Sequence, residues 1–84
     1  MNLKISEWDN INKYADKVCV DLKNKGFNVK PKQYDMYDGR KGLYLQVFDN
    51  NDRFYTQYAT GTWNNETEMK KAIDEMVKMI IAEA

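Results

Sequence analysis

Aromatic and arginine side chains recur around a predicted β-hairpin in the middle of the chain. These residue types are enriched at the energetic centres of protein interfaces, where rings bury area and a guanidinium binds a carboxylate. The hairpin spans residues 43–58, with strand-forming residues on both sides of a polar break at 49–52. Strand alternation sends its side chains to two faces, and nothing else in the chain is left to cover one of them. The candidate partner-binding residues on that face are Tyr37, Tyr44, Phe48, Arg53 and Tyr55, accompanied by Gln46 and Gln57. Strand propensity and cross-strand pairing alone would also favour such residues, so the sequence leaves both explanations open.

Four basic residues are candidates for nucleic-acid contact. Arg40 and Lys41 lie in a predicted loop, and Lys13 and Lys17 lie on a predicted helix. The whole chain carries 13 basic and 13 acidic residues, which argues against a general electrostatic affinity for nucleic acid or for an anionic membrane. Nucleic-acid binding would therefore depend on these local contacts.

Residues for catalysis and metal binding are scarce. The chain has no histidine, which excludes histidine acid–base chemistry, a Ser-His-Asp triad and most zinc sites. Cys19 is the single cysteine and lies beside an apolar helix stripe, where we expect a buried, inert thiol. Asp49 and Asp52 could suggest a metal-binding loop, but the segment around them lacks the glycine and the distal glutamate of an EF-hand. We therefore expect no enzymatic activity, no cofactor and no bound metal.

Hydrophobic periodicity predicts the elements that position these residues. Apolar residues at helical spacing predict a helix over 6–25, ended by Gly26, and a second helix that begins at Asn64 or Asn65. Between them, residues 27–37 predict an edge strand with a bulge or break at Pro31, followed by the hairpin. The expected fold is α+β, a three-stranded antiparallel sheet with two helices on one face in the order α-β-β-β-α, forming a single domain over 1–84.

The turn of the hairpin predicts its register. We expect left-handed conformations at the two asparagines of the break, and a loop of two or four residues pairs Phe48 with Arg53 and Val47 with Phe54. Alternation then defines the face under the helices. Its expected members are Leu43, Leu45, Val47, Phe54, Thr56 and Tyr58, joined by Tyr34 and Met36 of the first strand.

The element order resembles that of the double-stranded-RNA-binding domain. The resemblance implies RNA contact through the first helix, the loop after the first strand, here Arg40 and Lys41, and a lysine-rich start of the second helix. At that last position this chain instead has Asn64, Asn65 and Glu66. In size and composition the chain is also similar to small phage-encoded inhibitors, including anti-CRISPR proteins, which occupy a nucleic-acid-binding surface on a host effector.

Three functional hypotheses follow. The first is a protein-binding module, of the kind a phage or mobile element uses to inhibit a host effector complex that handles nucleic acid. The second is nucleic-acid binding, and the third is self-association through the outer sheet faces or through paired first strands, so that we expect a monomer or a homodimer. The lone cysteine and the absence of an apolar leader in MNLKISEW predict a cytoplasmic protein, and no apolar run is long enough to span a membrane.

Overall fold

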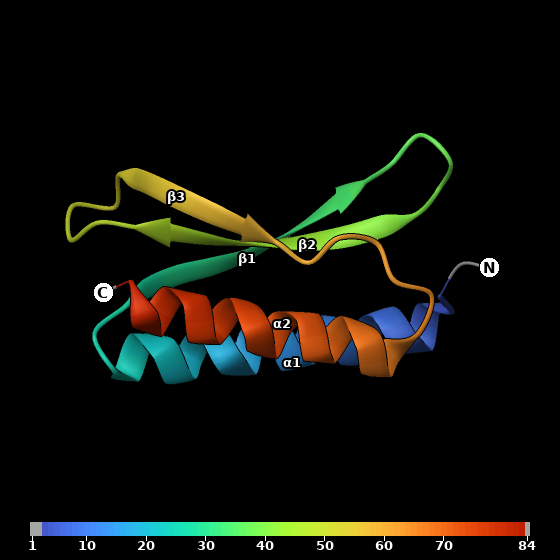
Figure 1. The fold of residues 1–84 in the computed structure, drawn as a ribbon, viewed down its shortest axis with the longest axis horizontal. Helices are drawn as coiled ribbons and strands as arrows, with labels where there is room; N and C mark the ends of the chain where they lie inside the picture. Colours follow the sequence, from blue (N-terminus) through green and yellow to red (C-terminus); the bar gives the residue numbers. More distant parts are fainter. Residues whose placement is uncertain (1–2, 84) are drawn as a thin grey trace.

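A twisted antiparallel sheet of three strands lies against two helices. The computed structural model describes residues 3–83. Figure 1 shows both helices side by side on one side of the sheet, which confirms the predicted α+β class and the α-β-β-β-α order. The strands stand in the spatial order β1-β2-β3. The elements are α1 (Ile5–Asn24), β1 (Asn28–Asp35), β2 (Lys41–Phe48), β3 (Phe54–Ala59) and α2 (Glu66–Ala82).

The hydrophobic core fills the space between the sheet and the helices. Strand β2 contributes Leu43 and Leu45, which are almost completely buried. Each helix buries one stripe of residues three or four positions apart, as an amphipathic helix requires. The other core residues are Trp8, Ile11, Ala15, Cys19 and Leu22 of α1, Val29 of β1, and Met69, Ile73, Met76 and Ile80 of α2.

Helix α1 ends as its sequence predicts. Gly26 adopts a left-handed conformation with φ of +96°, which glycine reaches easily because it has no Cβ. The N–H of Phe27 then donates to the carbonyl of Leu22 at 2.9 Å, which closes a Schellman motif and directs Phe27 back toward the core. Both helices, within the described residues, fall short of the combined length and apolarity that a membrane crossing takes.

The β2–β3 loop differs from the predicted turn. Asp52, rather than the two asparagines before it, takes the left-handed conformation with φ of 60°. The N–H of Asp49 donates to the carbonyl of Arg53 at 2.9 Å, so three residues form the loop. An odd loop length shifts the register by one, and Phe48 pairs with Phe54. The prediction that Phe54 belongs to the core was therefore wrong.

A bulge at Tyr55 then shifts the register a second time. Phe54 pairs with Phe48, whereas Thr56 pairs with Val47, so Tyr55 is an extra residue in β3. The second shift restores the predicted alternation. Thr56 and Tyr58 consequently face the helices, although each pairs two positions away from the residue that the sequence predicted.

The predicted break at Pro31 does not exist. Strand β1 pairs with β2 without interruption, with Pro31 opposite Leu45 and Tyr34 opposite Gly42. Leu45 bonds toward β3, so Pro31 and Leu45 form a non-hydrogen-bonded pair and the missing N–H of the proline lies on the outer edge of β1, where no bulge is needed. Tyr34 therefore points away from the helices and Met36 lies exposed in the following turn, so placing both in the core was wrong.

The start of α2 offers a test of the fold by mutation. The side chain of Asn65 accepts a hydrogen bond from the N–H of Glu68 at 2.8 Å and caps the helix. Replacing this residue (Asn65→Ala) should lower the free energy of unfolding by about 1 kcal/mol, because that N–H loses its partner. The neighbouring Asn64→Ala is the matched control and should change little. Urea denaturation of the two variants measures the difference, and equal losses would contradict the cap.

Candidate functional site

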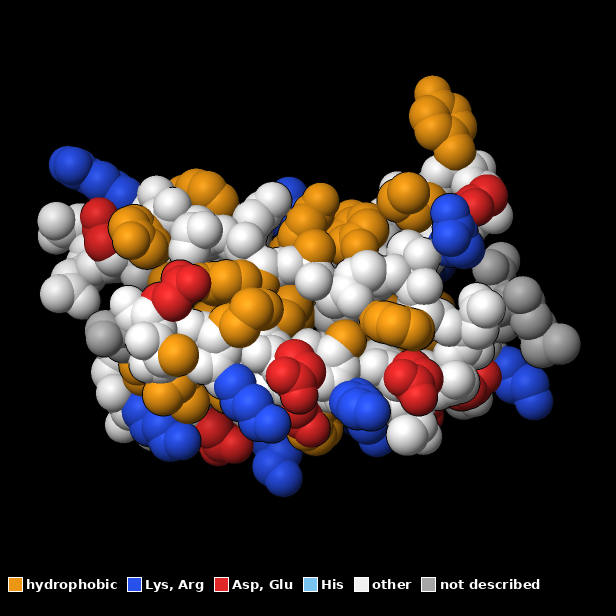
Figure 2. All heavy atoms as spheres, viewed as in Figure 1, with side chains coloured by type: hydrophobic (Ala, Val, Ile, Leu, Met, Phe, Trp, Pro, Cys, Tyr) orange, Lys and Arg blue, Asp and Glu red, His pale blue; other side chains and the backbone are white. Residues whose placement is uncertain are grey.

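The side of the sheet away from the helices is uncovered. No described element between residues 3 and 83 lies over it, as Figure 1 shows. In Figure 2, where the sheet is seen edge-on, hydrophobic side chains lie along the border of the sheet and between the sheet and the helices, and charged side chains lie mainly over the helices. We call the residues that alternation and register direct to this side the open face. Its lysine, glutamine and aromatic members are Lys30, Lys32 and Tyr34 of β1, Tyr44, Gln46 and Phe48 of β2, and Phe54 and Gln57 of β3.

Two tyrosines on adjacent strands form one end of the open face. The ring centroids of Tyr34 and Tyr44 are 4.5 Å apart, with 32° between the ring planes. Tyr34 lies directly over Gly42, since a Cβ at Gly42 would be only 2.3 Å from its ring. Glycine at this position therefore makes room for the tyrosine, and the two rings are held in place before any partner arrives.

Two phenylalanines form the other end. The rings of Phe48 and Phe54 are 6.1 Å apart and nearly perpendicular, a favourable edge-to-face arrangement. The ammonium of Lys30 lies 4.8 Å from the centre of the Phe48 ring, within the range of a cation–π contact. Phe54 is 55% exposed, so much of its surface is accessible to a partner.

Charge on the open face is positive although the chain as a whole is neutral. Lys30 and Lys32 belong to the face, and none of its residues is acidic. The nearest ion pair joins Lys30 to Asp52 in the β2–β3 loop at 4.0 Å, and both side chains are largely exposed. Such a pair stabilises the fold little. Both lysines therefore remain available to an acidic partner.

The structure brings together only part of the predicted binding residues. Tyr44 and Phe48 lie on the open face, as the sequence predicts. Tyr37 is 112% exposed in the β1–β2 loop, beyond the end of the strand. Arg53 lies in the β2–β3 loop, where its backbone N–H donates a hydrogen bond to the Asp49 carboxylate at 3.0 Å. Placing Tyr55 on this face was wrong, because the bulge turns it toward the helix side.

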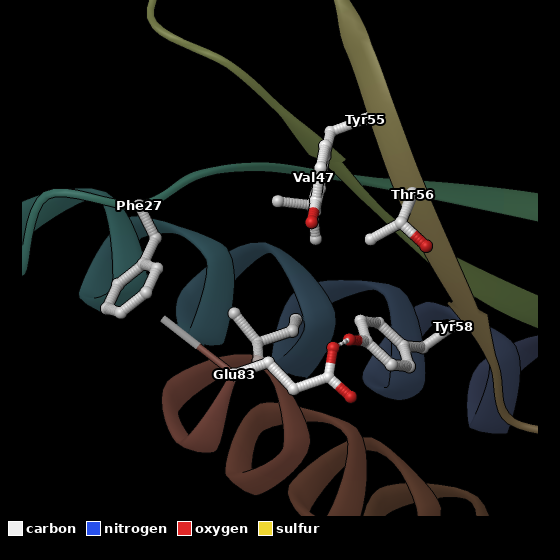
Figure 3. A pocket seen from close by; sticks show the side chains of 7 residues that line it. Phe27, Val47, Tyr55, Thr56, Tyr58 and Glu83 are labelled. Atoms are coloured by element: carbon white, nitrogen blue, oxygen red, sulfur yellow. Dashed lines mark hydrogen bonds between the residues drawn. The ribbon is translucent and has the colours of Figure 1, made fainter.

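Tyr55 instead borders a hollow between the sheet and the end of α2. Figure 3 shows its side chain near Val47 and Thr56, with Phe27 and Tyr58 on other sides of the hollow. The cavity measures about 130 Å³ and is mostly apolar. At one side the hydroxyl of Tyr58 donates to the carboxylate of Glu83, and this hydrogen bond raises the tyrosine pKa. The hollow holds no cluster of reactive groups.

The candidate nucleic-acid contacts in the β1–β2 hairpin are paired with acids. The Nε of Arg40 lies 2.6 Å from a carboxylate oxygen of Asp38. The pKa of Asp38 is lowered by a hydrogen bond from the backbone N–H of Arg40 and then by the Arg40 guanidinium. Lys41 lies 3.1 Å from Asp35. Lys13 and Lys17 are exposed on the other layer of the molecule, on α1. The four residues therefore do not form one basic surface.

The start of α2 is acidic and already satisfied within the chain. The carboxylate of Glu66 lies 2.9 Å from the ammonium of Lys70 and accepts a hydrogen bond from Asn10 at 3.1 Å. The lysine, then the asparagine, lower the pKa of Glu66. A phosphate approaching this end of the helix would meet a carboxylate that stays ionised. The arrangement does not reproduce the basic helix start that the RNA-binding resemblance implies.

Sequence reasoning missed four residues of the open face: Lys30, Lys32, Tyr34 and Phe54. The first three occupy alternate positions of β1, a signal that was present in the sequence but that an assumed break at Pro31 obscured. Phe54 had no comparable signal, because its direction depends on the loop length and the bulge described above.

Cys19 is a buried thiol, and the two aspartates of the β2–β3 loop form local hydrogen bonds. Burial, then the nearby charge of Asp16, raise the pKa of the Cys19 thiol to about 11. In the part of the chain that the structure describes, no three cysteine or acidic side chains gather into a possible metal site. Asp49 and Asp52 are engaged locally, since Asp49 accepts from the N–H of Asn51 at 2.9 Å and Asp52 accepts from Asn28 at 2.6 Å.

No protein-family model, curated protein or solved structure matches this chain. The helix and strand order and the antiparallel sheet are compatible with the resemblance to the double-stranded-RNA-binding domain, but no relative supports it.

The environment of Cys19 predicts slow thiol chemistry. In the native protein at pH 8 the neutral thiol predominates, because its folded pKa is about 11. A disulfide reagent such as Ellman's should therefore react slowly, faster as pH rises toward 11, and rapidly once urea unfolds the chain. The chain has one cysteine, so the absorbance reports that residue alone. Rapid native reaction at pH 8 would contradict a buried thiol.

The contact between Tyr34 and Gly42 predicts a coupled pair of mutations. Gly42→Ala should displace the Tyr34 ring and lower the free energy of unfolding by about 1 kcal/mol, the usual contribution of an aromatic pair. In a Tyr34→Ala background the same substitution should cost less, because no ring remains to be displaced. Urea denaturation of the four chains measures this coupling. Equal costs in both backgrounds would show that the ring does not lie over Gly42.

Proposed function

We propose that this protein is a non-enzymatic binding module whose open face holds an acidic surface of a protein partner. The observation that supports this proposal is the combination of paired aromatic rings and two lysines on a sheet face that no described element covers. Aromatic side chains at interfaces contribute large contact area, and rings fixed in advance lose little entropy on binding. The pairs Tyr34–Tyr44 and Phe48–Phe54 supply two such anchors.

Polar groups between and beside the rings would give the contact its direction. The amides of Gln46 and Gln57 bond to each other at 3.2 Å across β2 and β3 and retain further hydrogen-bonding capacity. Lys30 and Lys32 line the β1 side of the face, where they can meet carboxylates of a partner. Complementary charges of this kind speed association and favour the correct partner. An acidic partner surface with a few apolar side chains fits this pattern.

Single-stranded nucleic acid is a less favoured occupant of the open face. Binding of a phosphate backbone requires several cations along its path, and this face offers two. Base stacking also requires an accessible ring face, whereas Tyr34 and Tyr44 already lie against each other in a tilted pair and Lys30 lies over Phe48. The open face thus combines few charges with rings that are partly occupied.

The proposal restricts which region of a host effector an inhibitor of this kind could contact. A host effector that handles nucleic acid, of the CRISPR type, is the partner class suggested by size and composition. An inhibitor that mimics nucleic acid would present an acidic surface to the basic channel of the effector. Because the open face is positive, its contact would fall on an acidic region of such an effector instead.

A charge-reversal experiment tests the proposal. Immobilised wild-type protein is used to capture partners from a bacterial lysate, alongside the double variant Lys30→Glu and Lys32→Glu. The variant should lose roughly tenfold or more of the capture, since each lost charge contact contributes about 1 kcal/mol. Lys13→Glu with Lys17→Glu is the matched control, because it makes the same change in net charge on exposed positions of α1.

The controls separate the possible explanations. If both double variants capture partners as well as the wild type, the role of the open face is overturned. If both lose capture to the same extent, the effect is a general one of net charge. A labelled single-stranded oligonucleotide, titrated in parallel at low salt, tests the other class of partner. Tight binding that the open-face variant abolishes would replace the protein partner with nucleic acid.

A further inference from the structure

Strand β3 is an unprotected edge of the sheet. It lies at one end of the order β1-β2-β3, so one side of its backbone pairs with β2 and the other faces away. From Phe54 to Asn65 the sequence contains no charged residue and no proline, in a chain that is 31% charged. Natural proteins usually protect an exposed edge with lysine, proline or a covering element. β3 carries only a bulge near its start and a short length.

The opposite edge is protected in the usual way. Strand β1 carries Pro31 in its middle, flanked by Lys30 and Lys32. Pro31 lies opposite Leu45, and the absent N–H belongs to the side of β1 that faces away from β2. An incoming strand would find no donor there and would meet two lysines. This argues against the hypothesis that first strands pair edge to edge and leaves β3 as the accessible edge.

The ladder shows which groups of β3 are free. The N–H of Thr60 donates to the carbonyl of Leu43 at 2.9 Å, so this pair is hydrogen-bonded. Antiparallel pairs alternate between bonded and non-bonded, so Tyr58 and Thr56 also bond to β2 while Ala59 and Gln57 do not. The N–H and carbonyl groups of Gln57 and Ala59 therefore point outward. Tyr55, the extra residue of the bulge, lies two positions before Gln57 in the same strand.

We propose that a second copy of this chain pairs antiparallel with β3 about a two-fold axis at Gln57. In this register the Gln57 backbones of the two copies exchange both of their hydrogen bonds. Ala59 of each copy lies opposite Tyr55 of the other, and Thr56 lies opposite Tyr58. This register places on the axis a residue whose backbone groups point outward, whereas a register centred on Thr56 would place there a residue that bonds to β2. The result is a continuous six-stranded sheet.

The composition of β3 suits pairing with itself. At a two-fold axis each side chain meets its own copy or a near neighbour, so any charge near the centre would face a like charge. β3 has none, and the Gln57 side chain, exposed beside the axis, can both donate and accept hydrogen bonds. Because the axis is perpendicular to the sheet, the helices of both copies lie on one side and both open faces on the other.

Sedimentation equilibrium over a wide concentration range tests this pairing. Wild-type protein should reach twice the monomer mass of 10.0 kDa. Gln57→Lys and Gln57→Glu should each remain monomeric, because like charges meet at the axis, whereas an equal mixture of the two should recover the dimer. Lys32→Glu changes charge on the same face at β1 and should dimerise like wild type. Circular dichroism checks that each variant is folded.

Any other result overturns the proposal. A wild-type chain that stays monomeric at every concentration excludes the second copy and leaves an extended peptide as the alternative occupant of this edge. A dimer that persists in both Gln57 variants places the interface elsewhere, and loss of the dimer in Lys32→Glu points to the open faces. Monomeric variants that fail to recombine exclude the two-fold register, as does growth beyond two copies.

Discussion

The middle strand has two sides, and the chain can bury only one of them. Two amphipathic helices supply enough apolar surface for a single layer of core, which Leu43 and Leu45 complete. A domain of this size has no further element with which to cover the other side. Tyr44 and Phe48 therefore stay at the surface as a direct consequence of strand alternation. The open face, its rings and its lysines all depend on this limit.

The elements and their order could be predicted because each depends on local signals. The helical stripes have a period near 3.6, Gly26 ends α1 through its left-handed conformation, and Asn65 caps α2. The register could not be predicted in the same way. It depends on the backbone conformation of Asp52, on the bulge at Tyr55 and on the neighbouring strand, and each step of one residue reverses the direction of a side chain.

The same distinction separates the predicted from the missed site residues. Tyr44 and Phe48 belong to the central strand, whose direction is fixed by the burial of its leucines, and both were placed correctly. Phe54 and Tyr55 follow the loop, and two successive one-residue shifts exchanged their faces. Pro31 shows a different error: a proline was taken as a defect, whereas on an edge strand it interrupts nothing. The identity of a partner lies outside what alternation, caps and turns can encode.

The direction of the axis at Gln57 determines how many partners the molecule can hold at once. With both open faces on one side, two copies would present two equivalent binding sites to a common surface. A partner that is itself repeated, such as a filament or an assembly of identical subunits, would then be held by both sites together. The second contact forms at a high effective concentration, so residence lengthens without any new contact at either site. Avidity, rather than the affinity of one small face, would then determine occupancy.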